Sequence, residues 1–399
     1  MRMESSHDQV CFSMDIAWSR DNISHLEHYR VDRLNCWRDL VPGSFLAQSP
    51  DAMDDEPVTR EFAPGTLVPS YDPSLVLELS RARLNNTVDF DALVPGRFYP
   101  QGLISGIPGV FKGNMTPFKC IGKTGQGITA DLNHALARVP LALTLRDMIR
   151  EPVAGERGGS CVDWMDMILS GPGMQAVSGT DIKAFSNKGY FRRADDSPDD
   201  LFYRRERLVH HIDARARKTL SQWYGNILPK GGRILDLMAS WESHLPQGLA
   251  CADIHGLGMN KKELSANKAL TGMTVQDLNQ SPALAFPDQS FDAVVCSLSV
   301  EYLTDPVRVF REAARVLKPG GVFALAFSNR WFPEKNIRVW RHLHEFERMG
   351  LVLDYFSAAG GFDNLATVSF RGYPRPVDDP YYPGQKFSDP VYGVRGTAH

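Results

Sequence analysis

The chain has 399 residues, of which 43% are hydrophobic and 23% charged, so its composition is that of a globular protein with roughly two to three domains. Its formal net charge of -3 gives no reason to expect a nucleic acid or an anionic membrane as a partner. No apolar run approaches the roughly 20 residues that span a bilayer, and the N-terminus lacks the apolar stretch of a signal peptide.

The six cysteines are scattered along the chain, without a Cys-x-x-Cys pair. Free thiols in a reducing cytoplasm are therefore expected. No Cys/His cluster has the spacing of zinc ligands, so the sequence predicts no metal site. These features predict a cytoplasmic protein, and they carry no signal for an oligomeric state.

Residues 1–155 form the first predicted domain, which is mainly β. Pro-Gly pairs at 42–43, 64–65, 95–96 and 108–109 separate short apolar runs of strand length. The last two predicted strands of this domain are Gln126–Asp131 and Leu141–Met148.

Part of this domain resembles the FKBP-type prolyl isomerases. Asp131–Ala137, followed by an alternating strand, resembles the closing segment of that family. Ser70–Val76 resembles the segment before its flap. Asp39–Leu46 resembles the Pro-Gly segment that leads into its helix. Arg138 stands where the family has a small glycine, and Thr66–Pro69 replaces its Ala-Tyr-Gly. The resemblance therefore implies an FKBP-like scaffold that has lost its active site; a retained isomerase is the alternative.

Residues 156–196 are rich in Gly, Ser and Asp and are predicted to be a connector, with one helix over the apolar island Trp164–Leu169. Ser197 as N-cap and Pro198 at the first helical position predict the start of a helix that runs to Asp213. Apolar residues at three-to-four spacing continue as a second helical stripe: Ile212, Ala216, Leu220 and Tyr224.

From residue 233 strand and helix patterns alternate, which predicts an α/β doubly wound, mostly parallel sheet. The predicted strands are Ile234–Leu237, Ala252–Leu257, Thr274–Gln276, Phe291–Leu298 and Val322–Phe327. Helices are predicted at Val307–Leu317 and Asn336–Met349. Leu351–Phe356 and Leu365–Phe370 are expected to form a terminal antiparallel hairpin. Residues 373–399, rich in Pro and Tyr, lack periodicity and are expected to be a tail or a wrapping segment.

One run within this half is specific. Phe286–Val295, then Tyr302–Pro306 and Val316–Gly321, resemble the S-adenosylmethionine-dependent class I methyltransferases, in particular the small-molecule, type 11-like group. The resemblance covers about residues 197–372. It implies a seven-stranded Rossmann-like sheet, S-adenosylmethionine as the cofactor and a small molecule as the methyl acceptor.

The resemblance also implies where the cofactor binds. Asp236 ends the first strand, but Met238–His244 has no glycine where the family has a Gly-x-Gly loop. Gly258 stands in place of the family's ribose-binding acid, and Asn260 is expected to supply part of that contact. Asp277 matches the position that receives the adenine amino group. The implied cofactor-binding residues are Asp236, Met238, Ser240, Trp241, Gly258, Met259, Asn260, Asp277, Leu278 and Ser297. Alternatively, Asp236 caps its loop and Trp241 belongs to the core.

Methyl transfer depends mainly on alignment of the acceptor, and a base is needed only if a proton must leave. The catalytic candidates are Glu301 and Tyr302 after the fourth strand, His244 in the first loop and Tyr203 on the helix expected to cover the site. Glu301 as a helix cap and His244 as a satisfied loop histidine are the alternatives. The glycine-free loop also leaves open a non-catalytic protein, in which a pseudo-methyltransferase is fused to a chaperone-like module.

Overall fold

The structure is a computed structural model. It describes residues 8–40, 57–85, 89–152, 158–175, 189–249 and 253–399. The chain divides into two compact units, and each is discontinuous in sequence. The first unit consists of Met1–Arg20, Tyr29–Phe185 and Leu343–Gly350, and the second of Asp21–His28, Ser186–His342 and Leu351–His399. The domain boundaries expected from the sequence, at residues 155, 196 and 372, stay a prediction. Among the described residues, no helix is long and apolar enough to cross a membrane.

The first unit is mainly β, as predicted. One group of antiparallel strands has the order β2-β1-β8-β3, with β1 at Asp8–Arg20, β2 at Ile23–Asn35, β3 at Val58–Phe62 and β8 at Leu141–Pro152. A smaller sheet has the order β4-β7-β6-β5, with β4 at Val76–Ser80, β5 at Phe98–Pro100, β6 at Pro117–Lys123 and β7 at Gly127–Asp131. Short 3₁₀ turns connect these strands at Pro73–Leu75, Arg81–Arg83, Phe90–Ala92 and Gln101–Leu103.

In the described part of the predicted connector lies one short helix, α2 at Trp164–Leu169. The Asp163 carboxylate caps it by accepting from the Asp166 N–H at 3.0 Å. Trp164 and Ile168 are buried in the same core cluster as Phe12 of β1. The predicted helix is confirmed, but this segment is part of the first unit's core. The FKBP resemblance stays a prediction, and residues 41–46 of its motif lie outside the described residues.

The sheet of the second unit has the order β11-β10-β9-β12-β13-β15-β14, next to the first residues of β2. The strands β9 to β13 are parallel, and β15 is antiparallel to both of its neighbours. The predicted doubly wound, mostly parallel sheet is thus confirmed. The strands are β9 Arg233–Leu237, β10 Asp253–Gly258, β11 Gly272–Val275, β12 Phe291–Ser297, β13 Leu317–Phe327, β14 Phe362–Arg371 and β15 Val391–Ala398. Residue 252, the start of one predicted strand, lies outside the described residues.

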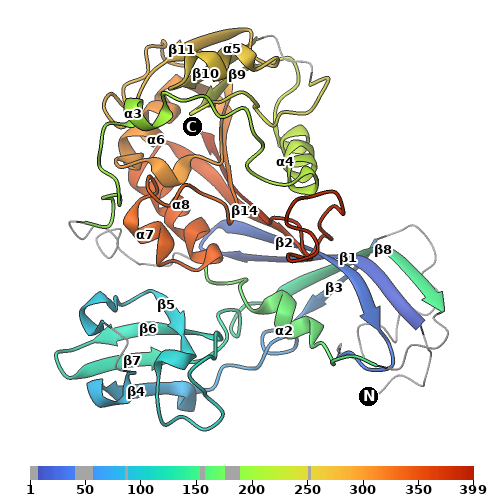
Figure 1. Ribbon diagram of the computed structural model, residues 1–399. Helices are drawn as coiled ribbons and strands as arrows, with labels where there is room; N and C mark the ends of the chain where they lie inside the picture. Colours follow the sequence, from blue (N-terminus) through green and yellow to red (C-terminus); the bar gives the residue numbers. More distant parts are fainter. Residues whose placement is uncertain (1–7, 41–56, 86–88, 153–157, 176–188, 250–252) are drawn as a thin grey trace. The chain divides into compact units, whose positions relative to one another are not determined.

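Helices cover both faces of this sheet (Figure 1). On one face the buried stripe of α4, Ala214–Ile227, packs with Ala293 and Ala324 of neighbouring strands. On the other, Phe310 of α6 contacts Phe323 of β13 at a ring distance of 4.9 Å. The helices are α3 Asp199–Tyr203, α4 Ala214–Ile227, α5 Lys261–Ala266, α6 Pro306–Val316, α7 Arg338–Arg341 and α8 Glu345–Ala359. Along β13, Ala324 and Ala326 alternate with Phe323, Leu325 and Phe327, so this strand contributes to two apolar layers.

Three predicted elements were wrong. Leu351–Phe356 is helical within α8, because a continuous apolar run suits a buried helix as well as a buried strand. The hairpin partner of β14 is β15, which lies in the segment predicted to be a tail. The helix predicted to reach Asp213 is the short α3, which ends at Tyr203, and its N-cap residue is Pro198, not Ser197.

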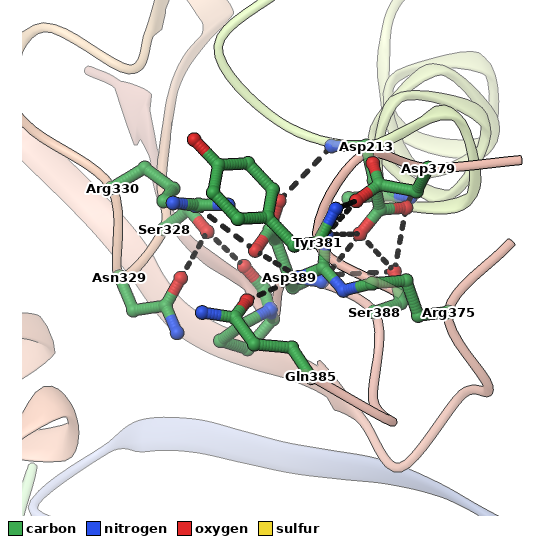
Figure 2. A network of polar contacts seen from close by, with 12 residues as sticks. Asp213, Ser328, Asn329, Arg330, Arg375, Asp379, Tyr381, Gln385, Ser388 and Asp389 are labelled. Carbon is green, nitrogen blue, oxygen red and sulfur yellow. Dashed lines mark hydrogen bonds and ion pairs between the residues drawn. The ribbon is translucent and has the colours of Figure 1, made fainter. Parts of the chain in front are cut away.

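The segment between β14 and β15 is fixed by a buried arginine (Figure 2). The Arg375 guanidinium donates to Asp379 Oδ1 at 2.9 Å and to Asp389 Oδ1 at 2.6 Å, and it lies 3.6 Å from Asp213 Oδ2. Asp213 is also the N-cap of α4, where it accepts from the Arg215 N–H at 2.8 Å. Ser388 donates to the same carboxylate at 2.9 Å. The chain leading into β15 is thus tied to the start of α4.

Candidate active site

A pocket lies at the carboxyl ends of β9, β10 and β12, where the strand order of the second unit reverses. Open α/β sheets bind their ligands at this position. Measured out to its open mouth, the pocket has a volume of about 1080 Å³. All ten predicted cofactor-binding residues line this pocket.

Asp236, the last acid of β9, is 2% exposed. Ser243 donates to one of its oxygens, and the other, Oδ2, has no hydrogen-bond partner among the described residues. Burial raises the pKa of Asp236 to about 7. Asn267 in turn donates to Ser243 Oγ at 2.9 Å, which holds the serine in place. The carboxyl group therefore holds its loop and still presents an unsatisfied oxygen in the pocket.

The loops of this pocket contain strained backbone at residues other than glycine. Met238, His244 and Leu298 have φ angles of +56°, +54° and +54°, in the left-handed region that favours glycine. Each such residue costs on the order of 1–3 kcal/mol, and strain of this kind concentrates at functional sites. Met238 follows β9 directly, so the loop adopts a glycine-type conformation without a glycine.

The end of β10 lies very close to the loop that follows β9. The Ala239 N–H donates to the Leu257 carbonyl at 2.8 Å, and a Cβ atom on Gly258 would overlap the Ala239 carbonyl oxygen. No side chain fits at Gly258 in this backbone, so an acid could not occupy this position. The missing ribose-binding acid is thus a consequence of the close approach of two strand ends.

Asn260 caps α5 and connects it to α3. Its Oδ1 accepts from the Lys262 N–H at 2.9 Å and the Glu263 N–H at 3.2 Å. Its Nδ2 donates to the carbonyls of Tyr203 at 2.9 Å and Arg204 at 3.3 Å. Both ends of the amide are therefore engaged within the protein. Asn260 lines the pocket, but its side chain mainly positions the neighbouring segments.

Ser240 and Trp241 are held from outside the first loop. Ser240 Oγ donates to Glu263 Oε2 at 2.7 Å, and Trp241 Nε1 donates to the Val209 carbonyl at 3.1 Å. Glu263 also accepts from the Arg207 N–H at 2.7 Å. Trp241 is only half-buried, and it forms part of the pocket wall. Sequence reasoning missed Glu263, although its position three residues after an N-cap asparagine is a known helix-start signature.

The third and fourth strands contribute the opposite wall. Asp277 Oδ1 accepts from the Asn279 N–H at 2.9 Å, and Asp277 Oδ2 from Gln280 Nε2 at 2.9 Å. Ser297 Oγ lies 2.8 Å from the Tyr224 hydroxyl. Met259 and Leu278 also line the pocket, as expected. Asp277 closes a turn and is exposed enough to meet a ligand as well.

Three of the four predicted catalytic residues line the pocket: Tyr203, Tyr302 and His244. The Tyr203 hydroxyl is buried without a hydrogen-bond partner among the described residues, and burial raises its pKa. The Tyr302 hydroxyl accepts from the Phe332 N–H at 2.9 Å. Burial lowers the pKa of His244 to about 4, so its imidazole is neutral near pH 7. The fourth, Glu301, is fully buried in a 3₁₀ turn at Val300–Tyr302 and is not among the lining residues.

A buried ion network fixes α3 beside the pocket. Asp199 is 3% exposed and accepts from Arg193 NH1 with both oxygens at 2.7 Å. Asn279 Nδ2 donates to Asp199 at 3.0 Å, and Lys335 Nζ lies 3.3 Å away. Sequence reasoning missed this network because its members are far apart in the chain and follow no local motif. It places Tyr203, at the end of α3, in the wall of the pocket.

The fold is an open α/β sheet of the kind that binds nucleotides. Its pocket lies where the strand order reverses and is rich in carboxylates. Residues 240–325 match the family described as "Methyltransferase domain". Residues 240–325 of the C-terminal half therefore resemble a methyltransferase domain, and S-adenosylmethionine, the predicted cofactor, is the cofactor of this class.

Curated methyltransferases are similar to part of this chain. The "Ubiquinone biosynthesis O-methyltransferase" of Parvibaculum lavamentivorans is 28% identical over 137 residues, which is 34% of this chain and 52% of that protein. The "Ubiquinone/menaquinone biosynthesis C-methyltransferase UbiE" of Bartonella henselae is 31% identical over 131 residues, or 32% and 48% of the two chains. The chain thus spans about half the length of these relatives.

Solved methyltransferase structures also align with part of the chain. A possible histamine N-methyltransferase of Thermotoga maritima is 18% identical, covering 46% of this chain and 90% of that one, with a TM-score of 0.35. This TM-score is below the level that supports a conclusion. The assignment of the domain therefore depends on the family match.

The residues of the pocket fit S-adenosylmethionine, which carries a sulfonium and an ammonium group. Five carboxylate side chains line the pocket: Asp199, Asp236, Glu242, Glu263 and Asp277. Arg207 is the one arginine or lysine among the described lining residues. The unpartnered, buried oxygen of Asp236 lacks a donor, which an ammonium group would supply.

Proposed function

We propose that the second unit transfers the methyl group of S-adenosylmethionine to a small-molecule acceptor. The observation that carries the proposal is the unpartnered Asp236 oxygen, buried at the carboxyl end of the first strand in a pocket lined by carboxylates. Such a site favours a cationic ligand, because a buried carboxyl group gains most from a charged donor. The matched family supplies the chemistry that such a ligand implies.

When bound, S-adenosylmethionine supplies an electrophilic methyl group on a sulfonium. Asp236 would hold the ammonium group, and Asp277 would accept from the adenine amino group. Trp241, fixed by its hydrogen bond to the Val209 carbonyl, would form a flat wall of the pocket. Gly258 would let the loop after β9 pack closely against the end of β10 in the pocket wall. These roles depend on rigid positions, which the hydrogen bonds of Ser243 and Glu263 maintain.

The acceptor side is formed by aromatic and histidine side chains. The rings of Tyr302 and Phe332 lie 5.9 Å apart, and His211 meets Phe332 at 5.4 Å. This wall suits an acceptor with a planar, apolar body. The neutral phenol of Tyr203 can donate a hydrogen bond to the acceptor. His244, neutral near pH 7, can accept one and so orient the acceptor's donor group.

The second candidate is a non-catalytic protein, a pseudo-methyltransferase joined to a chaperone-like module. It is favoured by the absence of glycine from Met238–His244. The left-handed backbone of Met238 argues against it, because the loop keeps its path at an energetic cost. A chain without a ligand for this loop would be free to relieve that strain.

Calorimetric titration with S-adenosylmethionine and its demethylated product tests the proposal. Binding is expected, and Asp277→Ala should weaken it by about 1.5–3 kcal/mol if the adenine contact is direct. Asp305→Ala, on the exposed start of α6, is the control and should bind normally. A folded protein that gives neither heat nor a thermal shift at millimolar cofactor would reject the proposal.

For the first unit, we propose an FKBP-like scaffold without prolyl isomerase activity. The support is Arg138, whose guanidinium carbon lies 3.4 Å from the centroid of the Tyr71 ring and so covers it. An isomerase pocket needs an open, aromatic-lined apolar cup. A protease-coupled peptide assay is expected to show negligible turnover, and robust turnover would reject this part of the proposal.

A further inference from the structure

A second pocket lies entirely within the first unit, apart from the methyltransferase domain. It is lined by the end of β1, by β5 and β6, and by the residues that follow β7, and its volume out to its mouth is about 1140 Å³. Nothing in the proposed methyl transfer uses it. Its lining differs sharply in charge from the carboxylate-rich pocket of the second unit.

Three cationic side chains line this pocket: Arg20, Lys119 and Arg138. Asp131 is the one carboxylate among the described lining residues. It stands opposite Lys119 in the β6–β7 register, but its Oδ1 is occupied by the Asn133 N–H at 2.9 Å and Asn133 Nδ2 at 2.8 Å. The pocket therefore carries an excess of positive charge.

The side chain of Lys119 makes no hydrogen bond or ion pair among the described residues. Its ammonium lies 5.6 Å from the Phe98 ring centroid and is only partly exposed. Burial lowers the pKa of Lys119, and the nearby charge of Arg20 lowers it further. The charge of Glu347 raises the pKa of Lys119. However, Glu347 Oε1 already accepts from Arg97 Nε at 3.2 Å and from the Phe98 N–H at 2.8 Å. The ammonium of Lys119 is thus left without a direct anionic partner.

Arg138 is likewise without a carboxylate partner among the described residues. Its guanidinium is stacked on Tyr71, which fixes the plane of the group and leaves the N–H donors along its edge. His134, at the same wall, is not a competing cation: burial lowers its pKa, its Nε2 contacts the Leu169 carbonyl at 2.9 Å and its Nδ1 accepts from the Leu136 N–H at 3.1 Å. Two cations therefore line the pocket, each beside an aromatic ring.

We propose that this pocket binds a small organic oxyanion, a carboxylate or a phosphate ester, between Lys119 and Arg138. A planar guanidinium fork pairs with both kinds of oxyanion, whereas an ammonium adds a compact charge without a directional fork. The rings of Tyr71 and Phe98 would contact the organic part of the ligand. The ligand supplies the anionic partner that the protein itself does not provide to these two cations.

The test is calorimetric titration of the full-length protein with pyrophosphate and, separately, with citrate. At least one of the two anions should bind, and the stronger binder identifies the class, phosphate or carboxylate. Lys119→Gln and Arg138→Gln should each weaken binding at least about tenfold, because each loses a charge-assisted hydrogen bond. Arg138→Lys keeps the charge but loses the fork, and an intermediate loss is expected.

Lys112→Gln is the matched control, because it removes one positive charge from an exposed position of the same unit outside the pocket lining. It should bind like the wild type. Melting temperatures of all variants establish that they are folded. The proposal is overturned if neither anion gives heat at millimolar concentration, or if Lys119→Gln and Arg138→Gln bind as well as Lys112→Gln.

Discussion

Gly258 and Ala239 touch in the wall of the pocket at the carboxyl ends of β9 and β10: a Cβ atom on Gly258 would overlap the Ala239 carbonyl oxygen. This contact joins the ends of β10 and β9, and the obstructing atom is backbone, which cannot rotate away. It explains why the last position of β10 carries no acid, although the resemblance implies one. Any ribose contact must come from other residues of the pocket.

Gly258→Ala should therefore destabilise the protein by about 1–3 kcal/mol, the usual cost of overpacking a tight site. Urea denaturation measures the change. Gly125→Ala is the control, because a Cβ there meets nothing within 4 Å and no left-handed φ is involved. Gly258→Asp should lose stability and gain no affinity for S-adenosylmethionine. A stable Gly258→Asp variant with tighter cofactor binding would contradict this account of the site.

Asp236 should make stability fall as pH rises. Its pKa of about 7 in the folded protein exceeds the ordinary value of 3.8, so the native state retains a proton that the unfolded chain releases. The stability that protonated Asp236 contributes is lost progressively between about pH 4 and pH 7. Above about pH 7 the ionised carboxylate has its full destabilising effect. Asp236→Asn cannot ionise, so its melting temperature should fall less than that of the wild type between about pH 5 and pH 8.

The same carboxyl group should couple cofactor binding to proton release. An ammonium group beside Asp236 favours the ionised form, so S-adenosylmethionine should bind with release of a proton below about pH 7. Titration in buffers with different ionisation enthalpies measures this release. Asp354→Asn is the control: Asp354 is buried outside the pocket with a pKa raised to about 8, so this variant should keep the release. Equal release in wild type and Asp236→Asn would show that another group is responsible.

Glu301→Gln should separate a structural role of Glu301 from a catalytic one. Glu301 is fully buried in the turn after β12, outside the pocket lining, and its backbone carbonyl accepts from the Ile337 N–H at 2.9 Å. The N-cap residue of α6 is Asp305. We expect a stability loss of about 1–3 kcal/mol with near-normal turnover, as for a perturbed buried polar group.

Turnover is measured with any acceptor found for the enzyme, and melting temperature in parallel. A variant that keeps its melting temperature and cofactor affinity but loses at least about a hundredfold in turnover would restore Glu301 to the catalytic residues. Tyr302→Phe provides the comparison within the same turn, since the Tyr302 ring does line the pocket.

Arg375 should be important for the stability of the second unit. Its side chain is 1% exposed among Asp213, Asp379 and Asp389 (Figure 2). Arg375→Met leaves these buried carboxylates without their main cation and should cost about 3–5 kcal/mol. Urea denaturation is the measurement. Arg204→Ala, in an exposed pair with Asp200 at 3.6 Å, should cost at most about 1 kcal/mol. Equal losses in the two variants would show that the cluster does not hold the segment before β15.

Local patterns predicted much of the second unit. The apolar runs at β9 and β12 can only be buried on both faces, and the stripe from Ile212 to Tyr224 has helical spacing. Asn260 is an N-cap, as expected. Because the carboxyl ends of parallel strands meet at one edge, the same patterns also placed Asp236, Trp241 and Tyr302 in a common pocket.

The sequence by itself thus determined many of the helices and strands, because their patterns involve residues within one turn or one strand of each other. The tertiary structure alone decided the contacts between distant segments: β15 between β13 and β14, Arg375 beside Asp213, and Asp199 beside Lys335. Periodicity reports which face of an element is apolar, but not which other element covers it. The position of an isolated charge in the sequence likewise does not identify its buried partner. The roles of Glu263 and Gly258 therefore follow only from the tertiary structure, in which the backbones of β9, β10 and α5 lie side by side.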